Sequence, residues 1–166
     1  MTMTMRMFLS DHSRMIEKRP FREEYETPEQ RAIEDEVKRY IEKTSNVICR
    51  KLPKRDVLDF ALCVEEQIVG FCEVRSRSCS WSTIEEGGFY LPFKKHLRIR
   101  SLHQANGIPT ALVVVCRDRV MRLWMGKHDD LEVIWWGDTR TDETHDREPM
   151  IVVPAFLFTH LYDRKS

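Results

Sequence analysis

The sequence predicts an α/β fold in one domain, with helices and strands alternating along the chain. Its 166 residues are enough for a single domain with its own apolar core. Apolar residues recur at helical spacing after Thr27, and strand-like apolar runs occur at 59–64, 68–74 and 110–116. Residues 1–26 are polar and of mixed charge, so we expect a flexible N-terminal arm before a domain spanning 27–166.

Composition argues against several protein classes. Basic and acidic side chains number 27 each, so the net charge of zero indicates no particular partner. The five cysteines show no C-x-x-C spacing, which is typical of buried thiols in a reducing compartment. No apolar run approaches the roughly 20 residues that span a bilayer, and the N-terminus lacks the apolar stretch of a signal peptide. We therefore expect a cytoplasmic protein with no membrane contact.

The first helix is predicted to run from Pro28 to about Thr44. Thr27 can cap the helix and proline is favoured in its first turn. An apolar stripe follows, made of Ile33, Val37, Tyr40, Ile41 and Thr44. Glu34 and Glu36 lie on opposite shoulders of that stripe, and helical geometry alone does not decide which of them points toward a site.

A β-hairpin is predicted over residues 59–77, with the sequence DFALCVEEQIVGFCEVRSR. If the turn centres on Glu66, Asp59 lies opposite Glu73, and Arg75 shares their face because side chains alternate along a strand. Carboxylates on two paired strands form a candidate divalent-metal site. Alternatively, these acids face solvent, or one of them forms a structural ion pair with Arg75.

The remaining elements complete the expected sheet. A short strand at 47–52 precedes the hairpin, and residues 76–90 are predicted to form a long loop in which Trp81 is exposed or docks on the domain. A second helix is expected from Pro92 to about Ala105, closed by Gly107. The continuous apolar run at 110–116 predicts a buried strand. Further strands are expected at 120–124, 131–136 and 150–158, and we expect the last of them to close the sheet.

Charge is distributed unevenly along the second half of the chain. Residues 87–128 hold eight lysines and arginines but one acid, whereas residues 129–148 hold eight acids but two arginines. The basic helix, with Lys94, Lys95 and Arg98, could follow a phosphate backbone. Its charges could equally be ordinary solvated side chains that pair with the acidic segment.

The order of these features resembles the PD-(D/E)XK nuclease superfamily, in its Holliday-junction-resolvase-like branch. A helix carries an acid, a strand carries aspartate, the next strand carries an E-x-basic motif, and a helix with lysine precedes a buried strand. The strings RAIE, LDFAL, EVRSR, NGIPTALVVV and DREPMIVVP are similar to small phage and prophage proteins of this superfamily. The resemblance implies a restriction-endonuclease-like αβββαβ core, with a mixed central sheet flanked by helices and extra C-terminal strands.

The resemblance also implies roles for particular residues. It assigns metal binding to Asp59, Glu73 and the backbone carbonyl of Val74, and it selects Glu34 rather than Glu36 as the helix acid, which could hold a metal-bound water or a second ion. The implied metal is Mg²⁺ or Mn²⁺, which suits carboxylate oxygens and phosphodiester hydrolysis.

The basic residues include one departure from the family pattern. The lysine of the motif is replaced by Arg75, which can clamp a phosphate but cannot plausibly act as a base. Lys95 matches the lysine that projects from the following helix. Arg77, Lys94, Lys95 and Arg98 are the candidate nucleic-acid contacts.

Two functions follow as expectations. The first is a Mg²⁺-dependent DNA endonuclease, with branched or single-stranded DNA among its candidate substrates. The second, suggested by Arg75, is a catalytically weak or inactive nuclease-fold protein that binds nucleic acid or a host protein. A homodimer is a further candidate assembly, and the acidic segment 129–148 is a candidate surface for contact with a host protein.

Overall fold

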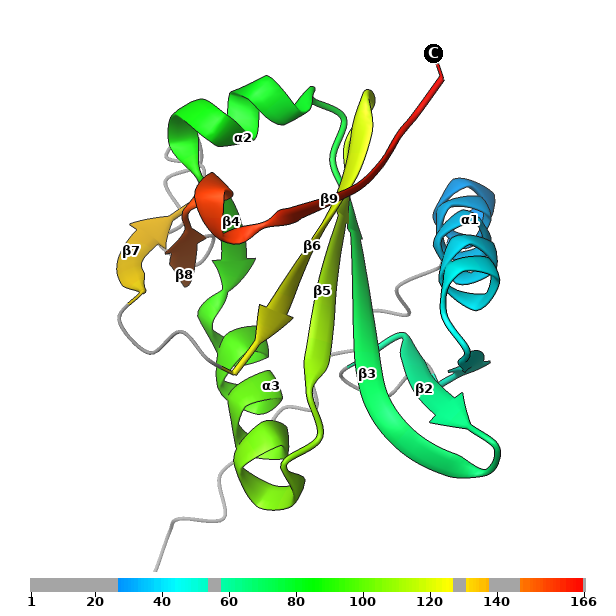
Figure 1. Ribbon diagram of the computed structural model, residues 1–166. Helices are drawn as coiled ribbons and strands as arrows, with labels where there is room; N and C mark the ends of the chain where they lie inside the picture. Colours follow the sequence, from blue (N-terminus) through cyan, green and yellow to red (C-terminus); the bar gives the residue numbers. More distant parts are fainter. Residues whose placement is uncertain (1–26, 54–57, 127–130, 138–146, 166) are drawn as a thin grey trace, which may run out of the picture.

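The computed structural model describes residues 27–53, 58–126, 131–137 and 147–165. Within them a six-stranded mixed sheet is accompanied by helices and a smaller three-stranded sheet (Figure 1). This confirms the predicted α/β class with a mixed central sheet, flanking helices and extra strands, as in a restriction-endonuclease-like fold. The predicted arm at 1–26 lies outside the described residues and stays a prediction.

The central sheet has the strand order β1-β2-β3-β5-β6-β9. Strands β3 and β5 are parallel, and all other neighbouring pairs are antiparallel. The run predicted as a buried strand is β5, and all of its residues are buried. The strand bounds are β1 (Ile48–Lys51), β2 (Phe60–Val64), β3 (Gln67–Ser76), β5 (Thr110–Val115), β6 (Arg119–Met125) and β9 (Thr159–Asp163).

Helix α1 (Pro28–Thr44) covers one face of this sheet (Figure 1). Thr27 and Gln30 form a capping box, in which each side chain accepts a hydrogen bond from the other residue's backbone N–H. Val37 is fully buried against apolar residues of β2, β3 and β5. The predicted helix start and end are therefore confirmed, and the predicted stripe is buried or partly buried except at Thr44, which is exposed.

Helix α3 (Phe93–Asn106) lies on the opposite face of the sheet and leads from β4 into β5 (Figure 1). It begins directly after Pro92 and ends at Gly107, which adopts a left-handed conformation with φ of 70°. This agrees with the predicted second helix. The first turn of α3 carries Lys94 and Lys95, so the position of this turn matters for the site.

Residues 76–90 were predicted to form a loop, and that prediction is wrong. They contain α2 (Trp81–Gly87) and the start of β4 (Phe89–Pro92). Trp81 is only 2% exposed, its ring lies edge-on to Phe158, and its backbone N–H donates to Asp118 Oδ1 at 2.8 Å. These contacts come from distant parts of the chain, so the local sequence does not reveal them.

The C-terminal strands also differ from the prediction. Residues 150–158 do not close the central sheet, because β8 (Glu148–Val153) lies between β4 and β7 (Glu132–Trp136) in the second sheet. The strand that does close the central sheet is β9, which pairs with β6. An apolar run predicts a strand but not its partner, and here the partner β4 begins within the segment predicted as a loop.

The sequence also predicted buried thiols and no membrane-spanning segment. The five cysteines are free, and all but the partly buried Cys79 are buried. Among the described helices, none is long and apolar enough to cross a membrane.

Candidate active site

The β2–β3 hairpin places Asp59, the residue before β2, opposite Glu73 of β3. A two-residue turn joins the strands, and a β-bulge between Leu62 and the next residue shifts the register by one. Beyond the bulge Phe60 pairs with Cys72. Continued by one residue, this register sets Asp59 opposite Glu73, as the sequence predicted. Without the bulge, the same turn would set Asp59 opposite Cys72.

Asp59 lies just before β2, beside the edge of β3 that β2 does not extend far enough to cover. Its Oδ2 accepts a hydrogen bond from the backbone N–H of Val74 at 2.7 Å, because β2 begins only at Phe60 and offers Val74 no backbone partner there. The N–H and C=O of one strand residue point to the same side, so the Val74 carbonyl also points toward this edge. The edge thus brings a carboxylate and a carbonyl oxygen together.

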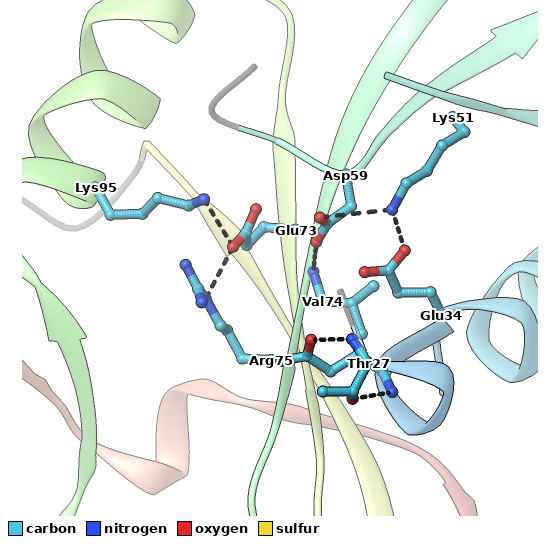
Figure 2. Close-up of polar contacts among 9 residues, drawn as sticks. Thr27, Glu34, Lys51, Asp59, Glu73, Val74, Arg75 and Lys95 are labelled. Carbon is cyan, nitrogen blue, oxygen red and sulfur yellow. Dashed lines mark hydrogen bonds and ion pairs between the residues drawn. The ribbon is translucent and has the colours of Figure 1, made fainter. Parts of the chain in front are cut away.

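Glu73 is a buried carboxylate, only 2% exposed, on the α3 face of the sheet. Its Oε1 lies 2.8 Å from Arg75 Nε and 2.8 Å from Lys95 Nζ (Figure 2). Its Oε2 is buried and has no hydrogen-bond partner among the described residues. An unpartnered buried carboxylate oxygen is costly, so this atom is a candidate ligand for a cation.

The electrostatics of Glu73 reflect both burial and charge. Burial, and after it the negative charge of Asp59, raise the pKa of Glu73 from 4.5 to about 7, although the positive charges of Arg75 and Lys95 act in the opposite direction. Two carboxylates therefore lie close enough to repel each other. A divalent cation between them would relieve that repulsion.

Glu34 on α1 contacts the ammonium of Lys51, which also lies 3.9 Å from Asp59 Oδ1 (Figure 2). Glu36 instead accepts bonds from Tyr162 and Arg164, which tie α1 to the C-terminal strand. Of the two helix acids, it is therefore Glu34 that points toward the candidate site. Its metal-binding role stays a prediction.

The three acids do not form one cluster. Glu34 approaches from the α1 face and Glu73 from the α3 face, with Asp59 at the edge between them (Figure 2). Among the described residues, no group of three Asp, Glu, His or Cys side chains is arranged to hold a metal ion. The candidate donors are two carboxylates and a carbonyl, a set that Mg²⁺ can accept because that ion keeps several water ligands.

A comparison with protein families supports this architecture. A family model described as "phage putative PDDEXK endonuclease" matches residues 20–161. The chain belongs to this phage PD-(D/E)XK family. The resemblance drawn from the sequence strings is thereby confirmed. No curated protein and no solved structure gives a significant match.

Within this PD-(D/E)XK chain the candidate nucleic-acid contacts differ in their surroundings. Lys94 and Arg98 are exposed on α3. Arg77 already donates to the backbone carbonyls of Ser76 and Tyr90, and its guanidinium lies 4.6 Å from the centroid of the Phe89 ring. Burial, and then the charge of Arg75, lower the pKa of Arg77. These contacts tie β3 to β4, so any role of Arg77 in DNA binding stays a prediction.

Sequence reasoning missed Lys51. It ends β1, where it pairs with Phe60, the residue after Asp59. No motif marks it, and its approach to Asp59 depends on pairing between strands. The available signal was its position on the short strand predicted just before the hairpin.

Proposed function

We propose that this protein is a Mg²⁺- or Mn²⁺-dependent DNA endonuclease that hydrolyses phosphodiester bonds. The observation that carries the proposal is the buried Glu73, which lies opposite Asp59 in the continued register of the hairpin and keeps one carboxylate oxygen without a hydrogen-bond partner among the described residues. A divalent ion held there would supply Lewis-acid chemistry to the phosphodiester. Membership of a phage endonuclease family supports the same activity.

The chain offers a defined set of oxygen donors for that ion. Asp59 Oδ1, Glu73 Oε2 and the Val74 carbonyl would bind it directly, because the other oxygen of each carboxylate is already bonded. Glu34 would act through a water molecule, since Lys51 lies between its carboxylate and Asp59.

The cations beside Glu73 suit a phosphate substrate. Lys95 and Arg75 would hold the scissile phosphate and stabilise the negative charge that develops on it. Arg75 cannot plausibly accept a proton, so its part is electrostatic. Exposed Lys94 and Arg98 on α3 would contact flanking phosphates, with Arg77 as a further candidate.

The direct test is cleavage of branched, single-stranded and duplex DNA with Mg²⁺ or Mn²⁺. Asp59→Asn and Glu73→Gln should each lower the rate by about a hundredfold or more, because each removes a charged metal ligand. Asp35→Asn is the matched control, since Asp35 is exposed on α1 next to Glu34. Cleavage that survives both site variants would overturn the proposal.

Arg75 favours a second candidate function, DNA or protein binding without efficient cleavage. Its guanidinium holds Glu73 at the position where the family has lysine. If Arg75→Lys gains cleavage, the natural site is a weakened nuclease; if both forms bind DNA without cutting it, the binding function stands.

We further infer that the protein acts on DNA in the cytoplasm of a bacterial host, where a host protein or a second copy are candidate partners.

A further inference from the structure

Lys51 lies at the candidate site on the side away from Lys95 (Figure 2). Strand pairing with Phe60, and a hydrogen bond from the Leu52 N–H to the Asp59 carbonyl at 2.9 Å, fix its backbone beside Asp59. Its ammonium lies 5.0 Å from the centroid of the Phe60 ring. The position of this cation is therefore set by the same strands that set the aspartate.

The two sides of the site hold their cations differently. Lys95 is 18% exposed and lies within hydrogen-bond distance of Glu73, whereas Lys51 is 40% exposed and its 3.9 Å separation from Asp59 exceeds that distance. Lysine carries its charge on a flexible four-carbon stem. Lys51 can therefore leave Asp59 more easily than Lys95 can leave Glu73.

We propose that Lys51 is a substrate-binding residue, which Glu34 and Asp59 hold in the metal-free site and which turns to the DNA phosphate once Asp59 binds a divalent ion. The inference rests on the proposed nuclease function and extends it. Lys51 competes with the divalent ion for Asp59 Oδ1, then supplies a positive charge on the α1 side of the phosphate. Arg75 and Lys95 supply theirs on the α3 side.

A purely structural role makes different predictions. If Lys51 only ties α1 to β1 through Glu34, removing its charge lowers the melting temperature and changes neither metal affinity nor DNA binding. If it competes with the metal, removing its charge tightens metal binding. If it binds phosphate, the same change weakens DNA binding and its dependence on salt.

The experiment compares Lys51→Gln and Lys51→Arg with the wild-type protein. Mn²⁺ affinity is measured by calorimetry, and DNA binding by fluorescence anisotropy in Ca²⁺ over a range of salt. We expect Lys51→Gln to bind Mn²⁺ several-fold more tightly, but DNA more weakly, with a salt slope lower by about one. Lys51→Arg should keep DNA binding. The control Arg50→Gln removes an exposed charge from the neighbouring position on β1 and should change neither Mn²⁺ affinity nor DNA binding.

The outcomes separate this inference from the nuclease proposal. Unchanged Mn²⁺ affinity and an unchanged salt slope in Lys51→Gln would overturn the role of Lys51 while wild-type cleavage upholds the nuclease. A wild-type protein that binds no Mn²⁺ would overturn both. Should Lys51→Gln fail to fold, Lys51→Met keeps the aliphatic stem over Phe60 and carries the same comparison.

Discussion

At the scale of single residues, Glu73 sets the energetics of the site. It is nearly inaccessible to water, and Arg75 and Lys95 both contact one of its oxygens. Burying a charge without full compensation favours its neutral form, which is why the pKa of Glu73 rises to about 7. The folded protein therefore binds a proton more tightly than the unfolded chain.

This shift predicts how stability depends on pH in the metal-free protein. The stabilisation from protonated Glu73 is complete below pH 4.5 and is lost as pH rises through about 7, an effect of roughly 3 kcal/mol. Urea unfolding in EDTA should show this loss in the wild type and not in Glu73→Gln. A parallel pH dependence of the two proteins would contradict the assignment.

The stabilisation that a bound metal ion provides should increase with pH. An ion needs the ionised carboxylate, so added Mg²⁺ should stabilise the wild type more at pH 8 than at pH 5.5, as measured by thermal unfolding. Glu73→Gln should lose most of this gain. Equal stabilisation at both pH values would argue against Glu73 as a ligand.

Individual site residues were predictable to different degrees. Asp59 and Glu73 are acids within runs that the sequence predicts as apolar strands, which is unusual enough to be noticed in the sequence. The contacts of Lys51, and the use of Arg77 to tie β3 to β4, depend on strand pairing and on side-chain directions. A single sequence does not determine those features.

At the scale of elements, the junction between α2 and β4 positions the start of α3. Gly88 has a φ of 79°, and an added Cβ would lie 2.7 Å from Val152 Cγ1. Gly88→Ala should therefore lower the free energy of unfolding by at least about 2 kcal/mol. Gly87→Ala is the control: an added Cβ there meets only the Tyr90 hydroxyl at 4.0 Å, so the change should be neutral or stabilising. Equal effects in urea unfolding would contradict this account.

Elements were predictable where their signals are local. The capping residues of α1, the glycine after α3 and the apolar run of β5 all lie within their own segments. Helix α2 buries only Trp81 and Ile84, and its N–H contact with Asp118 is distant in sequence. The bulge in the hairpin is likewise invisible in the sequence, although it sets the register of Asp59.

At the scale of the whole molecule, α3 exposes basic side chains that are the candidate contacts for DNA. Exposed Lys94 and Arg98 lie on the same helix as Lys95, which reaches Glu73. The double variant Lys94→Gln/Arg98→Gln should reduce the salt slope of DNA binding by about two and weaken binding to all sequences alike. Lys43→Gln, an exposed charge in the last turn of α1, is the control. Unchanged salt dependence would exclude α3 as the DNA contact.

The central claim is that Asp59 and Glu73 together hold a divalent ion. Anomalous diffraction from crystals soaked in Mn²⁺ tests it most directly. We predict one strong peak bounded by Asp59 Oδ1, Glu73 Oε2 and the carbonyl oxygen of Val74. A fully occupied peak elsewhere, or no peak while Arg75 and Lys95 stay on Glu73, would contradict it.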